Sequence, residues 1–372
     1  MRKAIPVLLI SLMTVMFAVG CSGSVSTSND AGSYADLLFD TSRVHTIEVS
    51  MSDGDRADQL ANPTDKTKYE ADVTVDGETI EDVSFQAKGN SSLFFMVDVG
   101  RDKYSYAINF GKHVEGQTFH GLDKMNLQNN FVDGSAMKEY MTYWLFRKMG
   151  VDAPLASFAW LTVNGEDQGL YTALEDVDDS FLERTTAGEG TLYKPEGSSM
   201  ALSDEEMERI KAGNSASHDS AFGTFPPEAK SFTDIDGIAV INAGIDSPLG
   251  GTVNEDRPMW RWILSDERYL DEYHDVLSEL VAIIDSGEFE AESGRVSELI
   301  LPYIEKDPKA VFTAEEAAKA QATINEITKL RAESVRRQLS GELASKTDLQ
   351  EAGDKVDASG ISIADMGTLA SL

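Results

Sequence analysis

Residues 119–150 read FHGLDKMNLQNNFVDGSAMKEYMTYWLFRKMG and predict a strand, a polar loop and a helix in that order. The segment KMNL is typical of a short half-buried strand, and QNNFVDGS is a run of turn and cap residues. Apolar residues then recur at three- and four-residue spacing, which is the period of a helix. Asp133 or Ser135 can cap the first turn with a side-chain oxygen. Gly150 can end the helix in a left-handed conformation.

Polar side chains are concentrated around the start of this predicted helix. Glu139 lies near its first turn, close in sequence to Asp133 and to the loop amides Gln128, Asn129 and Asn130. A well-capped core helix accounts for the apolar positions. The density of polar groups is unusual for a plain connector and also fits a binding site. From these residues alone both interpretations stay open.

The composition places limits on the partners of the protein. The chain has 372 residues, 41% of them hydrophobic, which is enough for one large domain or two ordinary ones. Acidic residues outnumber basic ones by 64 to 32, for a formal charge of −32. Nucleic acid and anionic lipid surfaces repel such a chain, so we expect no nucleic-acid partner. The charge suits a soluble extracellular protein, a basic partner or divalent cations, without choosing among them.

The first 21 residues have the pattern of a targeting segment. Two basic residues precede an apolar run from Ala4 to Val19, which is short for a membrane span. Small residues lead to Cys21, the only cysteine, which excludes an intramolecular disulfide. The pattern resembles a bacterial lipoprotein signal with Cys21 as the lipidated residue; an ordinary secretory signal is the alternative. Residues 22–42 predict a flexible tether, so we expect an extracytoplasmic protein, lipid-anchored to the cell membrane.

The stretch from residue 44 to 110 predicts mostly strands. Alternating segments flank Asp76-Gly77, a strong hairpin signal because both residues accept positive φ. A second hairpin turns at Asn164-Gly165. Lys103 stands at the start of another alternating strand. A small polar turn follows a strand and can offer backbone N–H groups to a phosphate, although an ordinary turn is the alternative; it consists of Lys88, Gly89, Asn90, Ser91 and Ser92.

The last third of the chain predicts amphipathic helices. One helix covers the segment SDERYLDEYHDVLSELVAIID, where His274 is expected to be a packed or capping residue. A loop, PYIEKDP, separates it from a long helix that we expect to end at Gly341.

Several motifs follow one another in the order of a known family. KGNSS, FHGL-K-NLQNN, VNGE-QGLY, LYKPEG and PYIEKDP resemble the CotH family, secreted and spore-coat proteins that are themselves similar to eukaryotic protein kinases. The resemblance implies an α+β, protein-kinase-like two-lobed fold, reduced in the middle. It places a CotH kinase-like domain at residues 43–345, with a β-rich N-lobe at about 43–195 and a helical C-lobe at about 196–345. Residues 346–372 would form the tail of the same domain.

The resemblance also implies a nucleotide site that binds ATP with Mg²⁺ or Mn²⁺. In such a site a lysine holds the phosphates and a helical glutamate orients that lysine. By resemblance, Lys103 is the lysine and Glu139 its partner. The turn from Lys88 to Ser92 lies near the phosphates, and Glu175 contributes to the hinge and adenine pocket.

The second half of the expected site departs from the family pattern. Family members carry a long helical insertion and an HNYYLY-like catalytic loop, whereas here Lys194 is followed by a shortened stretch that ends in HDSAFGTF. Asp219 is the only nearby carboxylate that can serve as the catalytic and metal-binding aspartate. His218 can act as a base on chemical grounds, but it matches nothing in the family.

Three functional hypotheses follow. The first is an extracytoplasmic kinase that phosphorylates serine or threonine on secreted or coat proteins. The second is a catalytically inactive relative that acts as an envelope or spore-coat scaffold. A mis-joined or truncated gene product is a separate explanation of the missing loop. The third, which needs no family, is an acidic lipoprotein that binds cations or a basic partner.

Overall fold

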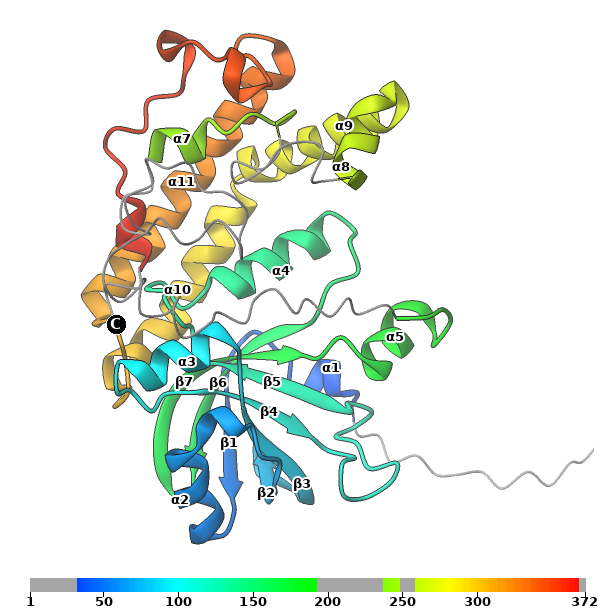
Figure 1. Ribbon diagram of the computed structural model, residues 1–372, viewed down its shortest axis with the longest axis vertical. Coiled ribbons are helices and arrows are strands. Elements are labelled where there is room, and N and C mark those ends of the chain that lie inside the picture. The colour runs from blue at the N-terminus through cyan, green and yellow to red at the C-terminus, as the bar shows by residue number, and fades with distance from the viewer. Residues whose placement is uncertain (1–31, 193–236, 248–257, 368–372) are drawn as a thin grey trace, which may run out of the picture. The chain divides into compact units, whose positions relative to one another are not determined.

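A computed structural model describes residues 32–192, 237–247 and 258–367 (Figure 1). The expected signal segment with Cys21, most of the tether, and Lys194, His218 and Asp219 lie outside these ranges. Within them, no helix combines the length and the apolar character needed to cross a membrane.

Seven strands close into a barrel in the first part of the described chain. Their order around the barrel is β1-β2-β3-β4-β5-β7-β6. Strand β6 pairs in parallel with β1, and the other neighbouring strands are antiparallel. The strands are β1 (Val44–Ser50), β2 (Tyr69–Val75), β3 (Glu78–Lys88), β4 (Ser105–Asn109), β5 (Lys124–Gln128), β6 (Ala156–Val163) and β7 (Glu166–Glu175).

The two predicted hairpins are confirmed. Asp76-Gly77 joins β2 to β3 with φ angles of 48° and 93°, and Asn164-Gly165 joins β6 to β7 with φ angles of 50° and 79°. Two consecutive positive φ angles are what a two-residue hairpin of matching twist requires.

Alternation along the strands separates the barrel interior from its outer surface. Aromatic and aliphatic side chains fill the interior, among them Phe85 and Tyr106, whose rings stack at 4.5 Å. The outward faces of β6 and β7 are also apolar and pack with helices in a second core. Phe158 of β6, for example, lies 5.1 Å from the ring of Tyr140 on the helix α4. The barrel is therefore covered by helices on one side.

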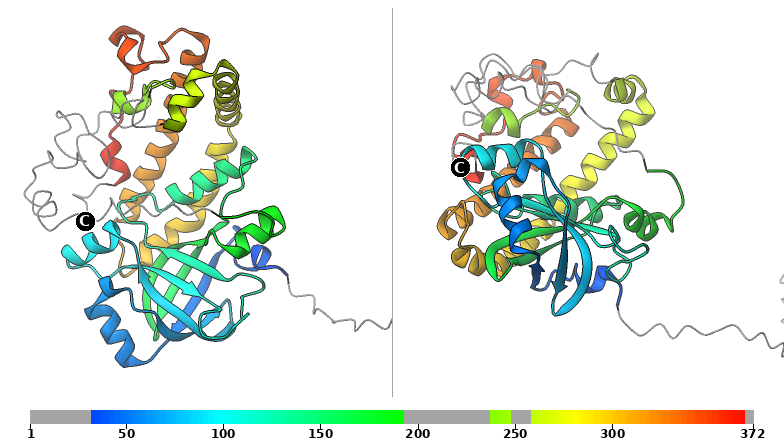
Figure 2. Two further views of the ribbon diagram at one scale, coloured as in Figure 1. Left: turned by 45° about the vertical axis from the view of Figure 1, so that its right-hand side comes forward. Right: turned by 60° about the horizontal axis from the view of Figure 1, so that its bottom comes forward.

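Helices make up most of the described chain after the barrel (Figure 2). The predicted long helix begins with a capping box at Thr313 and ends at Gly341 with φ 81°, so its expected end is confirmed. The helices are α1 (Tyr34–Leu37), α2 (Asp53–Ala61), α3 (Ser91–Asp98), α4 (Lys138–Lys148), α5 (Asp179–Thr186), α7 (Gly237–Ile241), α8 (Pro258–Ser265), α9 (Glu267–Asp285), α10 (Glu288–Lys306), α11 (Ala314–Ser340), η1 (Pro63–Asp65), η6 (Thr347–Leu349), η7 (Ala352–Asp354) and η8 (Ile363–Met366).

The expected two-lobed kinase-like fold is wrong. The β-rich part is a closed seven-stranded barrel, and the helical region packs directly on the outer face of two of its strands. Closure depends on the parallel pairing of β1 with β6, which lie more than a hundred residues apart. Patterns within single strands carry no information about that pairing. The expected lobe boundary near residue 195 lies outside the described residues.

A buried ion pair connects the barrel to the end of α10. The ammonium of Lys103 lies 2.5 Å from Asp307, and their side chains are 8% and 2% exposed. The same carboxylate accepts the backbone N–H groups of Leu170 and Lys309, each at 2.8 Å. Burial lowers the pKa of Lys103, and the charge of Asp307 opposes that shift. The extra hydrogen bonds matter because a buried pair is stable only when its remaining polar atoms are satisfied.

Asp307 packs against Gly169, where there is no room for a side chain. Gly165, in the same hairpin, is a matched control for a test of this contact. A Cβ at Gly169, where φ is +94°, would overlap the carboxylate of Asp307, whereas a Cβ at Gly165, with φ +79°, would meet nothing. We expect Gly165→Ala to cost about 1 kcal/mol from backbone strain. Gly169→Ala should cost about 3 kcal/mol or more, because it also displaces a partner of a buried charge. Urea unfolding measures both, and equal costs would contradict the role of this contact.

Candidate functional site

A row of polar side chains crosses four strands on the outer face of the barrel. Lys88 pairs with Ser105, and Gln128 pairs with Thr172. Strands β4 and β5 are paired along the same register, which sets Ser105 beside Gln128. Ala87, next to Lys88, belongs to the interior core, so the lysine side chain is directed outward. The row therefore lies on the face from which α4 begins.

A cavity of about 350 Å³ opens beside this row. Its wall is formed mostly by the loop at residues 128–133, which joins β5 to α4, and by Lys138 and Glu139 in the first turn of α4. Ser92 and Ser105 complete the lining. The polar stretch that stood out in the sequence is thus the main wall of a cavity, which supports the binding-site interpretation over that of a plain core helix.

The cavity loop has a strained backbone. Asn130, Val132 and Ala136 have φ angles of 57°, 48° and 55°. A β-branched residue such as Val132 is a clear outlier in this region. Each such residue costs on the order of 1 kcal/mol or more, so the surroundings must enforce the conformation.

Asp133 is one of the groups that enforce it. Its Oδ1 accepts hydrogen bonds from the N–H and the hydroxyl of Ser135, at 3.0 and 2.6 Å. Its Oδ2 accepts the backbone N–H of Lys138 at 2.9 Å. Asp133 thus caps the first turn of α4, which was one of the two predicted alternatives. Ser135, the other alternative, accepts the N–H of Met137 at 3.3 Å.

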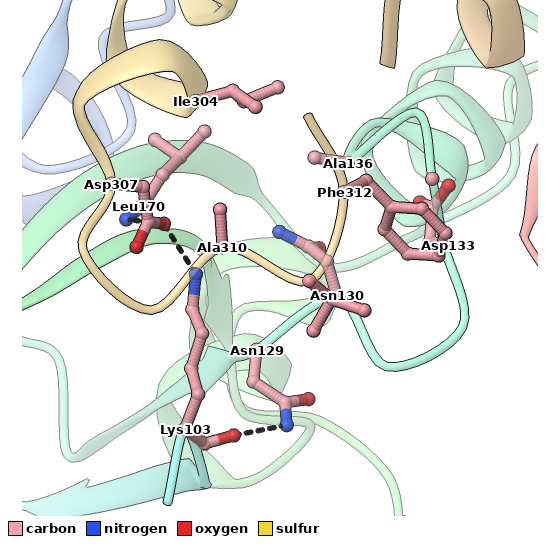
Figure 3. A pocket seen from close by; sticks show the side chains of 12 residues that line it. Lys103, Asn129, Asn130, Asp133, Ala136, Leu170, Ile304, Asp307, Ala310 and Phe312 are labelled. Carbon is pink, nitrogen blue, oxygen red and sulfur yellow. Dashed lines mark hydrogen bonds and ion pairs between the residues drawn. The ribbon is translucent and has the colours of Figure 1, made fainter. Parts of the chain in front are cut away.

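The loop amides fasten the loop to the barrel. Asn129 is buried; its Oδ1 accepts from the hydroxyl of Ser105 at 2.9 Å, and its amide donates to the carbonyl of Lys103 at 2.6 Å. Asn130 accepts the hydroxyl of Thr172 at 2.8 Å. A second, small cavity of about 30 Å³ lies on the other side of these amides, next to the ion pair of Lys103 (Figure 3). It has room for one or two water molecules.

Lys88, which pairs with the cavity-lining Ser105, and Glu139, which lines the cavity, influence each other through their charges. Burial lowers the pKa of Lys88, and the negative charge of Glu139 is the largest influence that opposes this. Burial raises the pKa of Glu139, and the positive charge of Lys88 is again the largest opposing influence. Gln128 also donates a long hydrogen bond of 3.5 Å to Glu139. Ionisable groups that are perturbed in this way beside a cavity are typical of functional sites.

The structure does not pair Lys103 with Glu139 as the resemblance implied. The strand expected to carry Lys103 begins two residues later, at Ser105, and the lysine ammonium contacts Asp307. Asp307 was missed because it lies 204 residues further along the chain. Its only signal in the sequence is its place in the motif PYIEKDP.

Glu175 is placed in a saturated structural cluster. Its carboxylate accepts hydrogen bonds from Tyr34 at 2.6 Å, from the N–H of Leu155 at 3.0 Å and from two nitrogens of Arg184 at 2.9 and 2.6 Å. These bonds hold α1 and α5 to the end of β7. A contribution of this carboxylate to an adenine pocket would need at least one of them to break.

The predicted phosphate turn lies at the edge of the cavity. It leaves β3 at Lys88, passes Gly89 with φ +111°, and enters α3 at Ser91. Asn90 accepts a hydrogen bond from Lys66 at 2.7 Å, and Ser92 lines the cavity. The expected metal aspartate, Asp219, lies outside the described residues. Within those residues, no group of three or more His, Cys, Asp or Glu side chains is arranged to hold a metal ion.

Comparisons with known proteins match the part of the chain that contains the cavity. Residues 85–224 match the model of a family described as CotH kinase protein. Inner spore coat protein H of Bacillus subtilis (strain 168) is 31% identical over 91 residues, 24% of each chain. An inner spore coat protein H-like protein of the same organism is 32% identical over 75 residues, 20% of this chain and 23% of its own. The matches span about a quarter of the length of these relatives. They confirm, over this part of the chain, the resemblance to the CotH family that the sequence motifs indicated.

Proposed function

We propose that the protein is a CotH-like spore-coat kinase. In this proposal the cavity of about 350 Å³ binds the phosphates of ATP, and the terminal phosphoryl group passes to serine or threonine of a secreted or coat protein. The observation that carries the proposal is the charge interaction of two half-buried side chains, Lys88 and Glu139, of which Glu139 lines the cavity. The family description and the names of the two relatives support it.

The charge of Lys88 explains why a phosphate is the expected ligand. Burial disfavours the ammonium, and Glu139 compensates only in part, because the pKa of Lys88 stays below its usual value. A phosphate group in the cavity would add negative charge next to this cation. Phosphoryl transfer relies mainly on such positioning and charge stabilisation, with a glutamate that orients the lysine. Lys88 therefore takes the role that the family pattern had suggested for Lys103.

Other groups at the cavity fit a phosphate better than they fit a metal. Ser92 and Lys138 line it and offer a hydroxyl and an ammonium donor. Mg²⁺ or Mn²⁺ prefers several oxygen ligands, and one lining carboxylate, that of Asp133, is already used to cap α4. The metal part of the proposal therefore depends on Asp219.

An inactive relative is the second candidate. The sequence after Lys194 lacks the catalytic loop of the family, so no residue is assigned to accept the substrate proton. Such a protein would bind the nucleotide at Lys88 and act as a scaffold for a partner protein in the envelope or coat.

A lysine substitution tests both candidates. The purified full chain is incubated with labelled ATP, Mg²⁺ or Mn²⁺ and an acceptor protein, and ATP affinity is measured in parallel. We expect Lys88→Gln to weaken ATP binding at least about tenfold, because it removes a charged contact to phosphate. Lys329→Gln, at an exposed ion pair with Glu290 on the helices, is the control and should bind normally.

The outcomes separate the two candidates. Label transfer that is lost in Lys88→Gln supports the kinase, and ATP binding without transfer supports the scaffold. Absence of ATP binding by the unmodified chain would refute both.

The raised pKa of Glu139 predicts that its ionised carboxylate lowers the stability of the protein at neutral pH. Burial raises the pKa of Glu139 above its ordinary 4.5. Its contribution to stability is therefore full below pH 4.5 and is lost as the pH rises through the folded-state pKa. Glu139→Gln keeps a neutral side chain, so the variant should unfold at higher urea than the unmodified protein at pH 8. The difference should vanish as the pH falls below 4.5.

Glu279→Gln, an exposed carboxylate on α9, serves as the control for this series. A Glu139→Gln variant that is less stable at pH 8 would show that the charged pair is stabilising and that burial is not the dominant influence.

We also propose that the protein is extracytoplasmic and anchored through lipid on Cys21. Expressed in a bacterial host and labelled with a fatty-acid analogue, the full chain should carry label and sediment with membranes. Cys21→Ser should lose the label, and Ser24→Ala should keep it. Label retained in Cys21→Ser would disprove the anchor.

A further inference from the structure

The described end of the chain contacts the loop that lines the cavity. The carbonyl oxygen of Met366, the last residue of η8, accepts the backbone N–H of Gly134 at 2.8 Å. The same oxygen accepts the ammonium of Lys138 at 2.8 Å. In Figures 1 and 2 this segment is the red turn beside α11. One carbonyl therefore fixes both the loop backbone and a cavity-lining cation.

Two glycines, Gly367 and Gly134, allow the backbone of the chain segment at Met366 to approach the backbone of the loop. Gly367 has φ +98°, and a Cβ there would lie 2.7 Å from the carbonyl oxygen of Val132 and 2.8 Å from the nitrogen of Gly134. A Cβ at Gly134 would lie 3.4 Å from the Met366 carbonyl and from Ala320 of α11. Because both limits come from backbone atoms or a packed helix, a side chain at Gly367 cannot be accommodated without moving the loop.

The segment is anchored to α11, which also holds the loop. Asp365 forms an ion pair of 2.8 Å with Lys319 of α11. Two residues further along that helix, Gln321 donates a hydrogen bond of 3.0 Å to the carbonyl of Ser135. The loop at residues 133–136 is therefore held by α11 and by the end of the chain together. This double contact accounts for the persistence of its strained φ angles.

We propose that residues 363–367 form a strap that holds the loop at residues 128–138 in its cavity-lining conformation. Docking of the strap keeps Lys138 fixed at the cavity. Release of the strap, by a partner that binds the end of the chain or by proteolysis, lets Val132 and its strained neighbours relax and dismantles the cavity wall. The strap would control the same cavity that the proposed function uses. The proposal rests on that function only for the identity of the ligand.

Hydrogen exchange of the full chain tests the strap without any ligand. Gly367→Val should raise the exchange rate of the amides in residues 130–138 about tenfold or more, because it removes the acceptor of Gly134. Gly360→Val is the matched control, because a Cβ at that glycine meets nothing and its φ is ordinary. Asp365→Asn, which leaves the backbone unchanged, should give a smaller increase and decides the matter if Gly367→Val does not fold.

ATP affinity measured on the same variants tests the coupling. We expect affinity to fall at least about tenfold in Gly367→Val and to stay unchanged in Gly360→Val. Unchanged exchange of the loop in both strap variants would overturn the strap. Faster exchange with unchanged ATP affinity would overturn its control of the cavity. If the unmodified chain binds no ATP, the proposed function fails, and the exchange rates alone still decide whether the strap exists.

Discussion

The buried ion pair of Lys103 with Asp307 is the contact on which the arrangement of barrel and helices depends. One carboxylate, placed just after α10, holds the segment before β4 and the backbone of β7 at the same time. A charge buried to this degree is very costly when its partner is missing, so the pair tolerates little displacement. The side-chain amide of Asn129, in the cavity loop, donates a hydrogen bond to the carbonyl of Lys103. The position of the loop is therefore fixed relative to the ion pair. The position of the cavity loop thus depends on the ion pair of Lys103 and Asp307, whose two charges neutralise each other.

Closure of the barrel explains why the site lies on the outside. The interior is filled by aromatic and aliphatic side chains, and none of the seven strands of the barrel has an unpaired edge. The polar residues of β3, β4, β5 and β7 therefore face outward, beside the cavity formed by Ser92 of α3, the start of α4 and the loop before it. Glu139 stands in the first turn of that helix, and the charge of Lys88 on β3 opposes the rise of its pKa. A helix inserted between two barrel strands thus places a carboxylate where its charge interacts with that of a half-buried lysine.

Several local features of this fold were predictable from the sequence, whereas long-range ones were not. The expected loop PYIEKDP is wrong, because residues 302–306 belong to α10. The hairpins at Asp76 and Asn164, the cap at Asp133 and the end of α11 depend on residues a few positions apart, so short patterns indicate them. Barrel closure depends on β1 meeting β6, which no short pattern encodes. The same limit applies to the site. The sequence placed Glu139 beside the loop amides, and the resemblance placed Lys88 near the phosphates. Neither showed that Lys103 forms an ion pair with Asp307.

The cavity wall has properties that folding alone does not explain. Burial disfavours the charges of both Lys88 and Glu139, and three residues of the loop have left-handed backbones. A phosphate bound at Lys88 would favour the conformation in which the loop lines the cavity, and the strap at Met366 favours that same conformation. Two contacts that select one state must strengthen each other, by the reciprocity of linkage. Ligand binding should therefore tighten the hold of the strap as much as the strap tightens the hold on the ligand.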